Sequence, residues 1–298
     1  MIAQSAASRA VVGDYIALAK PRIISLLLLT ALAGMFLAAK GPPDASLAAL
    51  VLIGGALAAA GANALNHFLE RDIDSRMRRT QTRPVASGRV SPANALAFGV
   101  ALNVAAFIIL GALVNVLCAM LTLSATLIYT LVYTVWLKRT TPQNIVIGGA
   151  AGAIPPMVGW AAVTGGLELP ALYLFAIIFF WTPPHFWALS LLIKDDYAKA
   201  GVPMLPVVSG IVETKWQILL YTALLVALTV MFFTTRAVGL TYLATAVSLG
   251  AGFLYYGWSL LRRPGVLGAR SMYLYSLLYL ALLFVAMAVD GTIAGWGT

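Results

Sequence analysis

The sequence predicts an all-α protein, a bundle of nine helices that crosses a membrane repeatedly. Of its 298 residues, 61% are hydrophobic and only 10% are charged, whereas about a quarter of residues are charged in soluble proteins. Apolar runs recur at the length that spans a bilayer, about 20 residues each. Because irregular backbone and open sheet edges cannot face lipid, these runs are expected to be helices.

Nine such runs follow one another and account for most of the chain. They lie at residues 22–40, 46–68, 93–114, 116–137, 143–163, 169–193, 215–235, 237–260 and 270–290. No stretch between them is long enough for a soluble domain, so residues 1–298 are predicted to form a single integral-membrane domain. Residues 1–20 are expected to be a short cytosolic segment before the first membrane helix.

Lysine and arginine predict the orientation of this bundle. With the N-terminus in the cytosol and nine crossings, all of the 19 lysines and arginines except Lys40 and Arg236 fall on the cytosolic side, in agreement with the positive-inside rule. The C-terminus then lies on the opposite side. Residues 1–20 lack the apolar core of a cleavable signal, and a bacterial inner membrane is the expected location. The net charge of +9 is attributed to topology and anionic lipid head groups, not to nucleic acid.

The polar stretch that ends the second run, NHFLERDID, holds the first candidate site. If the helix continues past the membrane surface, Asn66, Glu70 and Asp74 recur every four residues and share one face. Amide and carboxylate oxygens suit Mg²⁺ that also binds substrate phosphates. The alternative is a solvated loop that only sets topology. Against it, Asn63 and Asn66 lie inside the apolar run, where polar side chains are costly.

Cations that match phosphate oxygens follow these carboxylates and recur at the other cytosolic loops. The candidates for binding a diphosphate are Arg71, Arg78, Arg79, Arg83, Lys138, Arg139, Lys194 and Lys199. Carboxylates for a metal beside cations for phosphate are the chemistry of a diphosphate site.

A second long polar loop, residues 194–214, emerges on the same side and opens with Asp195 and Asp196. Two acidic clusters that face each other across the mouth of a bundle can hold two Mg²⁺ on one diphosphate. Adjacent residues do not share a helix face, so only one of these two is expected to be a direct ligand. The alternative is an ordinary Asp-Asp helix stop.

Aromatic residues precede Lys138 at the end of the fourth run. Tyr129 and Tyr133 lie one helical turn apart, and two interpretations remain open for them. They either contribute to a substrate pocket or form an interfacial aromatic belt with snorkelling cations.

The sixth run contains the segment FFWTPPHFWAL, residues 179–189, with two prolines and a histidine at membrane depth. The Pro-Pro pair is expected to break or kink the helix. An ionisable residue inside a membrane helix is a functional candidate, which singles out His185. Its alternative role is a hydrogen bond to a carbonyl freed by the kink. Trp181 and Phe186 either pack in the core or line a pocket for a flat or cationic ligand.

The first motif resembles the Asn-x-x-x-Asp-x-x-x-Asp motif of the UbiA-type intramembrane prenyltransferases, and RTQTRPVASGRVSP after it continues the likeness. Four further stretches are similar to the members that farnesylate haem B, so the resemblance covers nearly the whole chain. They are ALAKPRI (17–23), YTVWLKRTTPQNIVIGGAAGAIPPMVGW (133–160), TPPHFWAL (182–189) and KDDYAKAGVPMLPVV (194–208).

The resemblance implies a bundle with a central cavity open near the cytosolic face, and it implies a reaction. Farnesyl diphosphate loses diphosphate, its allylic carbon joins a vinyl group of haem B, and water completes haem O. Mg²⁺ is then the expected cofactor and haem B a substrate. A haem A synthase or oxidase assembly factors are the further partners that it suggests.

The resemblance also assigns roles to residues of this chain. Asn66, Glu70 and Asp74 are expected to hold the metal together with Asp195, and all four, with Asp196, are catalytic candidates. His185 is expected to bind haem, as an axial ligand of its iron. His67 is a second haem candidate, although it points away from the face that Asn66 and Glu70 share.

Three departures from the family pattern bear on these assignments. Glu70 stands where the family commonly has aspartate, which preserves the oxygen donors. Lys199, not a carboxylate, stands four residues after Asp195. Tyr133 and Lys138 are separated by four residues rather than by the three expected of a Tyr-x-x-x-Lys motif.

Three functions therefore remain open. The first is haem farnesylation. The second is prenylation of a quinone or chlorophyll precursor, which shares the first motif but gives the histidine at membrane depth no role. The third is transport, in which a broken sixth helix binds a solute at the midplane, and which leaves the clustered carboxylates and arginines unexplained.

Overall fold

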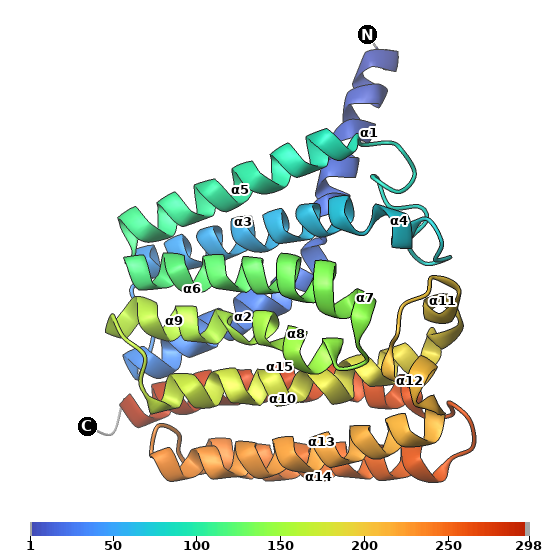
Figure 1. The fold of residues 1–298 in the computed structure, drawn as a ribbon. Coiled ribbons are helices and arrows are strands. Elements are labelled where there is room, and N and C mark those ends of the chain that lie inside the picture. The colour runs from blue at the N-terminus through green and yellow to red at the C-terminus, as the bar shows by residue number, and fades with distance from the viewer. Residues whose placement is uncertain (1, 296–298) are drawn as a thin grey trace.

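The computed structural model describes residues 2–295, which form helices and no strand within that range (Figure 1). The helices are α1 (Ile2–Ala19), α2 (Pro21–Ala39), α3 (Ala45–Leu69), α4 (Arg71–Asp74), α5 (Pro92–Leu113), α6 (Val116–Leu127), the π-helix η1 (Ile128–Leu137), α7 (Lys138–Thr140), α8 (Asn144–Ala153), α9 (Pro155–Thr164), α10 (Leu169–Leu192), α11 (Lys194–Lys199), α12 (Leu205–Val208), α13 (Gly210–Met231), the 3₁₀-helix η2 (Phe232–Thr235), α14 (Leu240–Arg262) and α15 (Ala269–Gly295). The predicted all-α class is confirmed.

Eight helical segments of the described chain are long and apolar enough to cross a membrane, one fewer than the nine predicted. The predicted run at 237–260 does form a long helix, α14, which packs against α13 and α15. Tyrosine, threonine and serine side chains dilute its apolar residues, and this separates α14 from the other eight. The chain is an integral membrane protein.

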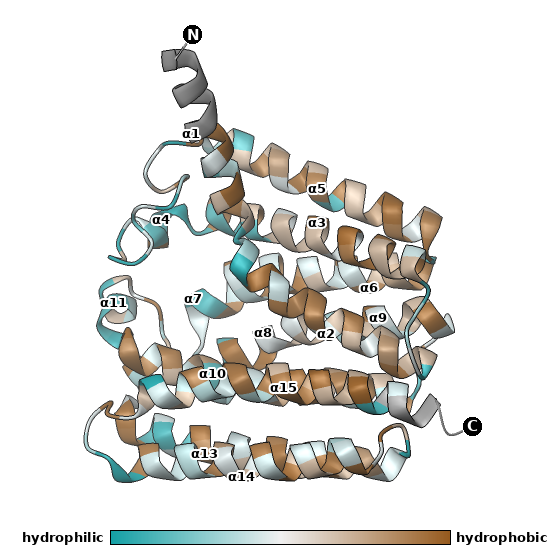
Figure 2. Cartoon of the chain, turned by 180° about the vertical axis from the view of Figure 1, so that it is seen from behind, coloured by the Kyte–Doolittle hydropathy of each residue, from teal (hydrophilic) through white to brown (hydrophobic). Residues whose placement is uncertain are grey.

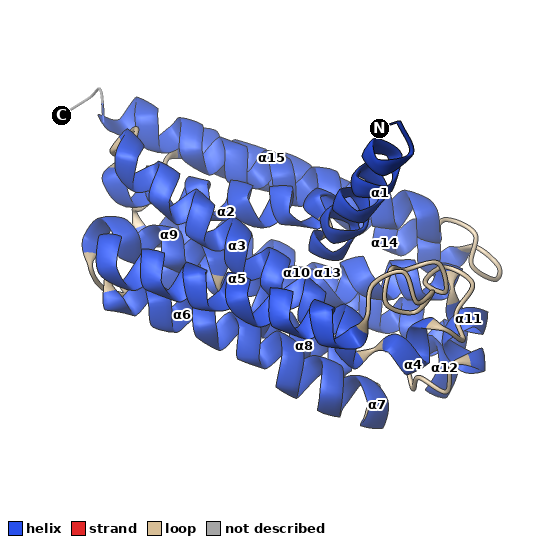
Figure 3. Cartoon of the chain, turned by 90° about the horizontal axis from the view of Figure 1, so that it is seen from above, coloured by secondary structure: helices blue, strands red, loops and turns tan. Residues whose placement is uncertain are grey.

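The long helices run side by side, and the short helices α4, α7, α11 and α12 gather at one end of the bundle (Figure 1). Hydrophilic residues concentrate at this end, whereas the bodies of the helices are largely apolar (Figure 2). We call this end the polar end. Viewed from above, α1 crosses the other helices instead of running along them (Figure 3). The segment expected to be a short N-terminal lead is thus itself a helix.

Glycine lets neighbouring helices approach closely, as is common in membrane bundles. A Cβ atom on Gly159 of α9 would collide with the backbone carbonyl of Ala31 in α2, and one on Gly34 of α2 would collide with the carbonyl of Pro156. The contact between α2 and α9 is therefore one of backbone against backbone. It forms one wall of the cavity described below.

Of the break or kink expected at Pro183 and Pro184, the break does not occur, because α10 continues without interruption from Leu169 to Leu192. The two prolines remove two intrahelical donors. The adjacent Thr182 hydroxyl donates to the carbonyl of Ile178 at 2.8 Å, and α8, α13 and α15 pack along the helix. Packing on several sides holds the segment helical. Without a break in α10, the transport interpretation loses its main support.

Candidate active site at the polar end

The first motif forms a buried cluster of oxygen donors where α3 passes into α4. Asn66, Glu70 and Asp74 are each only 2% exposed. The helical hydrogen-bond pattern continues through them, from the Glu70 amide to the Asn66 carbonyl at 2.9 Å and from the Asp74 amide to the Glu70 carbonyl at 2.8 Å. The spacing of four therefore places the three side chains on one face. Because burial removes these carboxylates from water, they need hydrogen-bonding or ion-pair partners within the protein.

Three cations from different parts of the chain supply those partners. The Lys138 ammonium donates to Oε1 of Glu70, and Nη1 of Arg83 lies 2.8 Å from both carboxylate oxygens of Asp74. Nη1 of Arg83 also lies 3.9 Å from Oε2 of Glu70. With the cation described next, the cluster has more positive than negative charge and attracts a polyanion.

Lys20, which lies in the ALAKPRI stretch but was not predicted as a site residue, is the third cation. Its ammonium donates to Oδ1 of Asn66 at 2.9 Å. Burial lowers the pKa of Lys20 to about 7; the charge of Arg83 acts in the same direction, and the charges of Glu70 and Asp74 oppose it. Burial by itself would raise the pKa of Glu70, but the neighbouring cations, Lys138 first among them, hold it below its usual value.

The π-helix η1 aligns Lys138 with the aromatic residues before it. Because a π-helix places residues five positions apart above one another, Lys138 stacks over Tyr133, with 5.8 Å from its nitrogen to the ring centroid. Tyr129 and Tyr133 are stacked in turn, with centroids 5.8 Å apart. The spacing that departed from the family motif is thus accommodated by backbone geometry. The π-helical geometry of η1 was not predicted from the sequence.

Thr134, also in η1, orients the first ligand candidate. Its hydroxyl accepts from Nδ2 of Asn66 at 3.1 Å and donates to the carbonyl of Tyr129 at 2.8 Å. With Nδ2 so engaged, Oδ1 of Asn66 faces Lys20. Thr134 was not a candidate, and only the three-dimensional arrangement identifies it.

The second polar loop reaches the cluster through a different residue than expected. Asp195 has 82% of its side chain exposed and lies 4.0 Å from the neighbouring Lys194, while Asp196 is half-buried. Tyr197, by contrast, is 1% exposed; burial raises its pKa to about 12, and the nearby charge of Arg79 opposes that rise. Asp195 and Asp196 as metal ligands stay a prediction.

The other basic candidates lie at the surface of the polar end, outside the buried cluster. Arg139 makes a two-pronged pair with Asp72 at 2.7 and 2.8 Å, and this hydrogen bonding lowers the pKa of Asp72. Arg71 donates to the carbonyl of Phe68 at 2.7 Å. The remaining two, Arg78 and Lys199, are exposed. These residues are available to a ligand that approaches from solvent.

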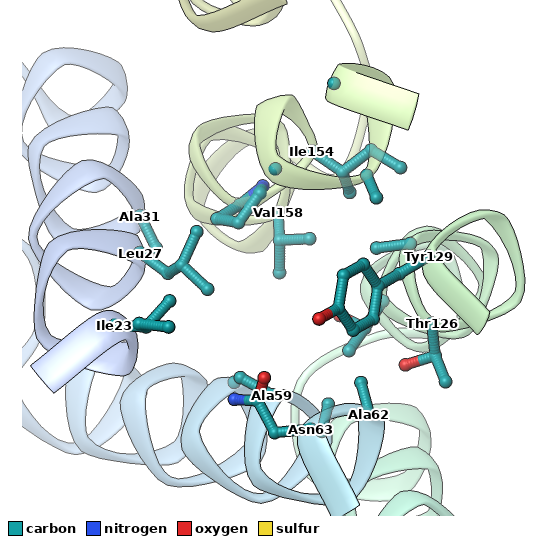
Figure 4. A pocket seen from close by; sticks show the side chains of 18 of the residues that line it. Ile23, Leu27, Ala31, Ala59, Ala62, Asn63, Thr126, Tyr129, Ile154 and Val158 are labelled. Atoms are coloured by element: carbon teal, nitrogen blue, oxygen red, sulfur yellow. The ribbon is translucent and has the colours of Figure 1, made fainter. Parts of the chain in front are cut away.

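An apolar cavity of about 350 Å³ opens beneath the cluster, between α2, α3, α6, η1, α8, α9 and α10 (Figure 4). Asn63, Tyr129 and Tyr133 line it towards the polar end, and Phe186 contributes from α10. Three of the four predicted pocket residues thus meet in it. Trp181 does not, because its indole N–H donates to the carbonyl of Ser276 in α15 at 2.8 Å.

The two histidines occupy contrasting positions. His185 lies on the side of α10 that faces α15, with Nδ1 2.7 Å from the hydroxyl of Ser276. His67 is 2% exposed, and neither ring nitrogen has a hydrogen-bond partner among the described residues. Neither histidine is part of the oxygen cluster.

The donor set fits a hard cation that shares its ligands with a substrate. Among residues 2–295 no three Asp, Glu, His or Cys side chains gather as a metal site. Asn66, Glu70 and Asp74 supply oxygens only, which suits Mg²⁺ completed by water and phosphate oxygens. The cluster is therefore adapted to a metal that arrives with an anion.

A membrane-embedded helical bundle whose carboxylates and cations meet above an apolar cavity defines an intramembrane site for an amphipathic anion. Residues 27–282 match the UbiA prenyltransferase family, and the chain belongs to that family.

Curated relatives support a finer comparison. The chain is 51% identical to the protoheme IX farnesyltransferase of Roseiflexus sp. (strain RS-1) over 93% of this chain and 52% of the relative. It is 51% identical to that of Symbiobacterium thermophilum over 95% of both chains. The chain thus spans about half the length of the first relative and nearly all of the second.

Solved structures share the fold at low identity. A digeranylgeranylglyceryl phosphate synthase superposes with a TM-score of 0.79 at 18% identity, over 95% of this chain and 99% of the other. A UbiA homolog from Archaeoglobus fulgidus, bound to DMAPP and Mg²⁺, gives 0.65 at 19% identity over 93% and 99%. Both establish the fold of this chain.

Proposed function

We propose that this protein transfers the farnesyl group of farnesyl diphosphate to a vinyl group of haem B, with addition of water, to give haem O and diphosphate. The observation that carries the proposal is the cation-rich oxygen cluster above an apolar cavity. The roughly 50% identity to protoheme IX farnesyltransferases supports the choice of donor and acceptor. The polar end then faces the cytosol of a bacterial inner membrane.

The cluster is suited to receive the diphosphate. Asn66, Glu70 and Asp74 would hold Mg²⁺, which when bound neutralises charge on the departing diphosphate. Lys138 and Arg83 balance the carboxylates in this structure, and the phosphate oxygens of a substrate offer these cations alternative acceptors. Charge stabilisation by positioned cations is the main contribution that such a site makes to a dissociative step.

The cavity is suited to receive the prenyl chain. Its lining is almost entirely apolar, which excludes water from the allylic carbon as the bond to the diphosphate oxygen breaks. The stacked rings of Tyr129 and Tyr133 lie between the cavity and Lys138. Aromatic faces stabilise developing positive charge, and they lie where that charge forms.

Bond making and breaking balance without an oxidant or reductant. The C1–O bond of farnesyl diphosphate breaks, and diphosphate leaves with the electron pair. A C–C bond forms between C1 and the terminal vinyl carbon, which leaves positive charge on the carbon attached to the porphyrin. Water adds there and loses a proton, giving the hydroxyethylfarnesyl group. The product suits delivery to a haem A synthase or oxidase assembly factors.

The test uses the purified chain in liposomes with Mg²⁺, farnesyl diphosphate and haem B, followed by mass spectrometry of the porphyrin. A product heavier by a farnesyl group plus water, absent in the Glu70→Gln/Asp74→Asn double variant, is the expected result. Prenylation of a quinone or chlorophyll precursor without any haem product would overturn the acceptor. The absence of product with every acceptor would overturn the proposal as a whole.

A further inference from the structure

Each of the three candidate metal ligands is already bound by a cation of the chain itself. Two of these cations face carboxylates and the third faces an amide, in the pairs Lys138–Glu70, Arg83–Asp74 and Lys20–Asn66. A metal that enters from solvent therefore meets oxygens that positive charge already surrounds, and like charges repel. In this state the cluster disfavours a free divalent cation.

Lys20 is the cation of the three that can leave at the lowest cost. Its partner is a neutral oxygen, Oδ1 of Asn66 at 2.9 Å. If Lys138 or Arg83 moved away, a carboxylate that is only 2% exposed would lose its partner, and an unpaired buried charge is strongly destabilising. The departure of Lys20 leaves only a neutral amide behind. Lys20 is therefore the cation that can exchange its partner.

The backbone around Lys20 directs its ammonium onto the cluster. Lys20 forms the turn between α1 and α2 in a left-handed conformation, with φ 56° and ψ 60°, and the φ angle of the following Pro21 is fixed by its ring. Nδ2 of Asn63 donates to the carbonyl of Ala19 at 2.9 Å, which ties this turn to α3 one helical turn before Asn66. The lysine thus reaches the cluster from an anchored turn.

Thr134 fixes which atom of Asn66 faces the lysine. The Thr134 hydroxyl has one proton, and it donates this proton to the carbonyl of Tyr129 at 2.8 Å. In its 3.1 Å contact with Nδ2 of Asn66, Thr134 must therefore accept. The amide is not free to turn around. Oδ1, the atom that a metal requires, is consequently the atom that Lys20 holds.

We propose that Lys20 makes the binding of the metal and the binding of the diphosphate depend on each other. With its ammonium on Oδ1 of Asn66, Lys20 opposes a free divalent cation. When a diphosphate enters, its phosphate oxygens take the ammonium and release Oδ1 for the metal. The site therefore binds Mg²⁺ and diphosphate together, and neither of them strongly alone. That the diphosphate belongs to a prenyl donor rests on the function proposed above.

The charges of the cluster favour joint binding. Its two carboxylates and three cations leave one positive charge. A divalent metal alone increases this excess, and a diphosphate alone reverses it, whereas the two together bring the charge close to balance. Because Glu70 and Asp74 are buried, water screens either imbalance poorly.

The test uses the full chain in neutral detergent micelles, Mn²⁺ in place of Mg²⁺, and inorganic diphosphate as the probe for the donor head group. Bound Mn²⁺ is measured by equilibrium dialysis, with and without diphosphate in both compartments. Diphosphate should tighten Mn²⁺ binding at least 10-fold in the unaltered protein, as is usual for coupled sites. In Lys20→Met, free Mn²⁺ should bind about 5- to 10-fold more tightly, and the tightening by diphosphate should be at least 5-fold smaller.

Three further variants separate this coupling from a structural role, which would not increase affinity for a metal when it is lost. Lys20→Gln removes the charge but keeps an N–H group for Asn66, and it should behave like Lys20→Met. Lys20→Arg keeps the charge and should retain the coupling. Arg22→Met removes an exposed cation two residues further on and should change neither affinity. Weaker binding of free Mn²⁺ in both neutral Lys20 variants, or unchanged coupling in them, would overturn the inference.

This outcome is distinguishable from that for the proposed function, because the dialysis contains neither haem nor a prenyl donor. Farnesylation of haem by a protein whose Mn²⁺ affinity does not respond to Lys20→Met overturns the coupling and leaves the reaction standing. Coupled binding of Mn²⁺ and diphosphate by a protein that forms no haem product supports the coupling and overturns the proposed acceptor.

Discussion

The two polar loops of this protein are nearly alike in sequence chemistry and differ sharply in structure. Both follow a long helix and combine carboxylates with lysine or arginine. In the first loop Glu70 and Asp74 are 2% exposed and paired, Glu70 with Lys138 of α7 and Asp74 with Arg83 nine residues further on. In the second, the Asp195 side chain is 82% exposed and its ion pair with Lys194 is sequence-adjacent.

This difference shows that burial, rather than composition, distinguishes a site from a charged surface. An exposed ion pair contributes little, about 0–1 kcal/mol. A buried carboxylate that loses its partner costs about 3–5 kcal/mol, so the buried pairing persists only where the surrounding structure fixes it. The first loop carries such a network, and the second contributes one buried tyrosine to it.

The largest effect is expected from neutralising the first loop. Glu70→Gln keeps the shape of the side chain but removes the charge that faces Lys138 and Arg83. Turnover should fall by about 100- to 1000-fold, the range for losing one preorganised electrostatic contact. The measurement is the rate of haem prenylation at saturating donor. Glu213→Gln, an exposed residue of α13, is the control and should leave the rate unchanged.

One cation beside each loop can be compared directly: Lys138 of α7, which pairs with the first loop, and Lys199 of the second loop. Lys138→Gln removes a buried ammonium that bonds to Glu70, whereas Lys199→Gln removes an exposed one. We expect kcat to fall about 10- to 100-fold for Lys138→Gln and less than 2-fold for Lys199→Gln, because exposed charges are screened by solvent. Equal losses in the two variants would show that the loops contribute alike and would contradict the comparison.

A third variant tests whether the first loop serves the cavity beneath it. Gly152 lines the cavity and a Cβ there meets no atom within 4 Å, so Gly152→Leu should fill part of the space without displacing the helix. KM for farnesyl diphosphate is expected to rise about 10-fold, since one or two lost methylene sites are worth about 1–3 kcal/mol.

The shorter geranyl diphosphate supplies the internal reference for this variant, and its KM should change less than 2-fold. Gly166, between α9 and α10, is equally unhindered but does not line the cavity, so Gly166→Leu is the matched control. A Gly152→Leu protein that handles both donors as before would place the prenyl chain elsewhere.

Much of this architecture could be predicted from local patterns. Apolar runs of spanning length gave the helices, because every backbone polar group in lipid must be satisfied within its own segment. A spacing of four residues correctly gathered Asn66, Glu70 and Asp74, because the helical hydrogen bonds continue past the membrane surface. Both the spanning helices and this shared face depend on residues that are close to one another in the sequence.

What could not be predicted depends on residues that are distant in sequence. Lys20 reaches Asn66 across 46 positions and His185 reaches Ser276 across 91, and neither partner carries a local signal. The widened turn of η1 that places Lys138 over Tyr133 also has no signature in the residues themselves. The unbroken α10 shows the same limit, since tertiary packing there overrides what proline does locally.

The smallest expected effect is the most informative about the second loop. Tyr197→Phe removes only the buried hydroxyl near Arg79, and the loss of one polar contact of about 0.5–1.5 kcal/mol corresponds to a roughly 2- to 13-fold loss of kcat/KM. Tyr255→Phe, on an exposed side chain, should have no effect.

Asp195→Asn is expected to change kcat/KM less than 2-fold, because its carboxylate faces solvent. If Asp195→Asn instead lowers kcat/KM more than Tyr197→Phe does, and if higher Mg²⁺ relieves that loss, the second loop acts through a metal, as its sequence alone suggests. The two loops would then be equivalent in function despite their unequal burial.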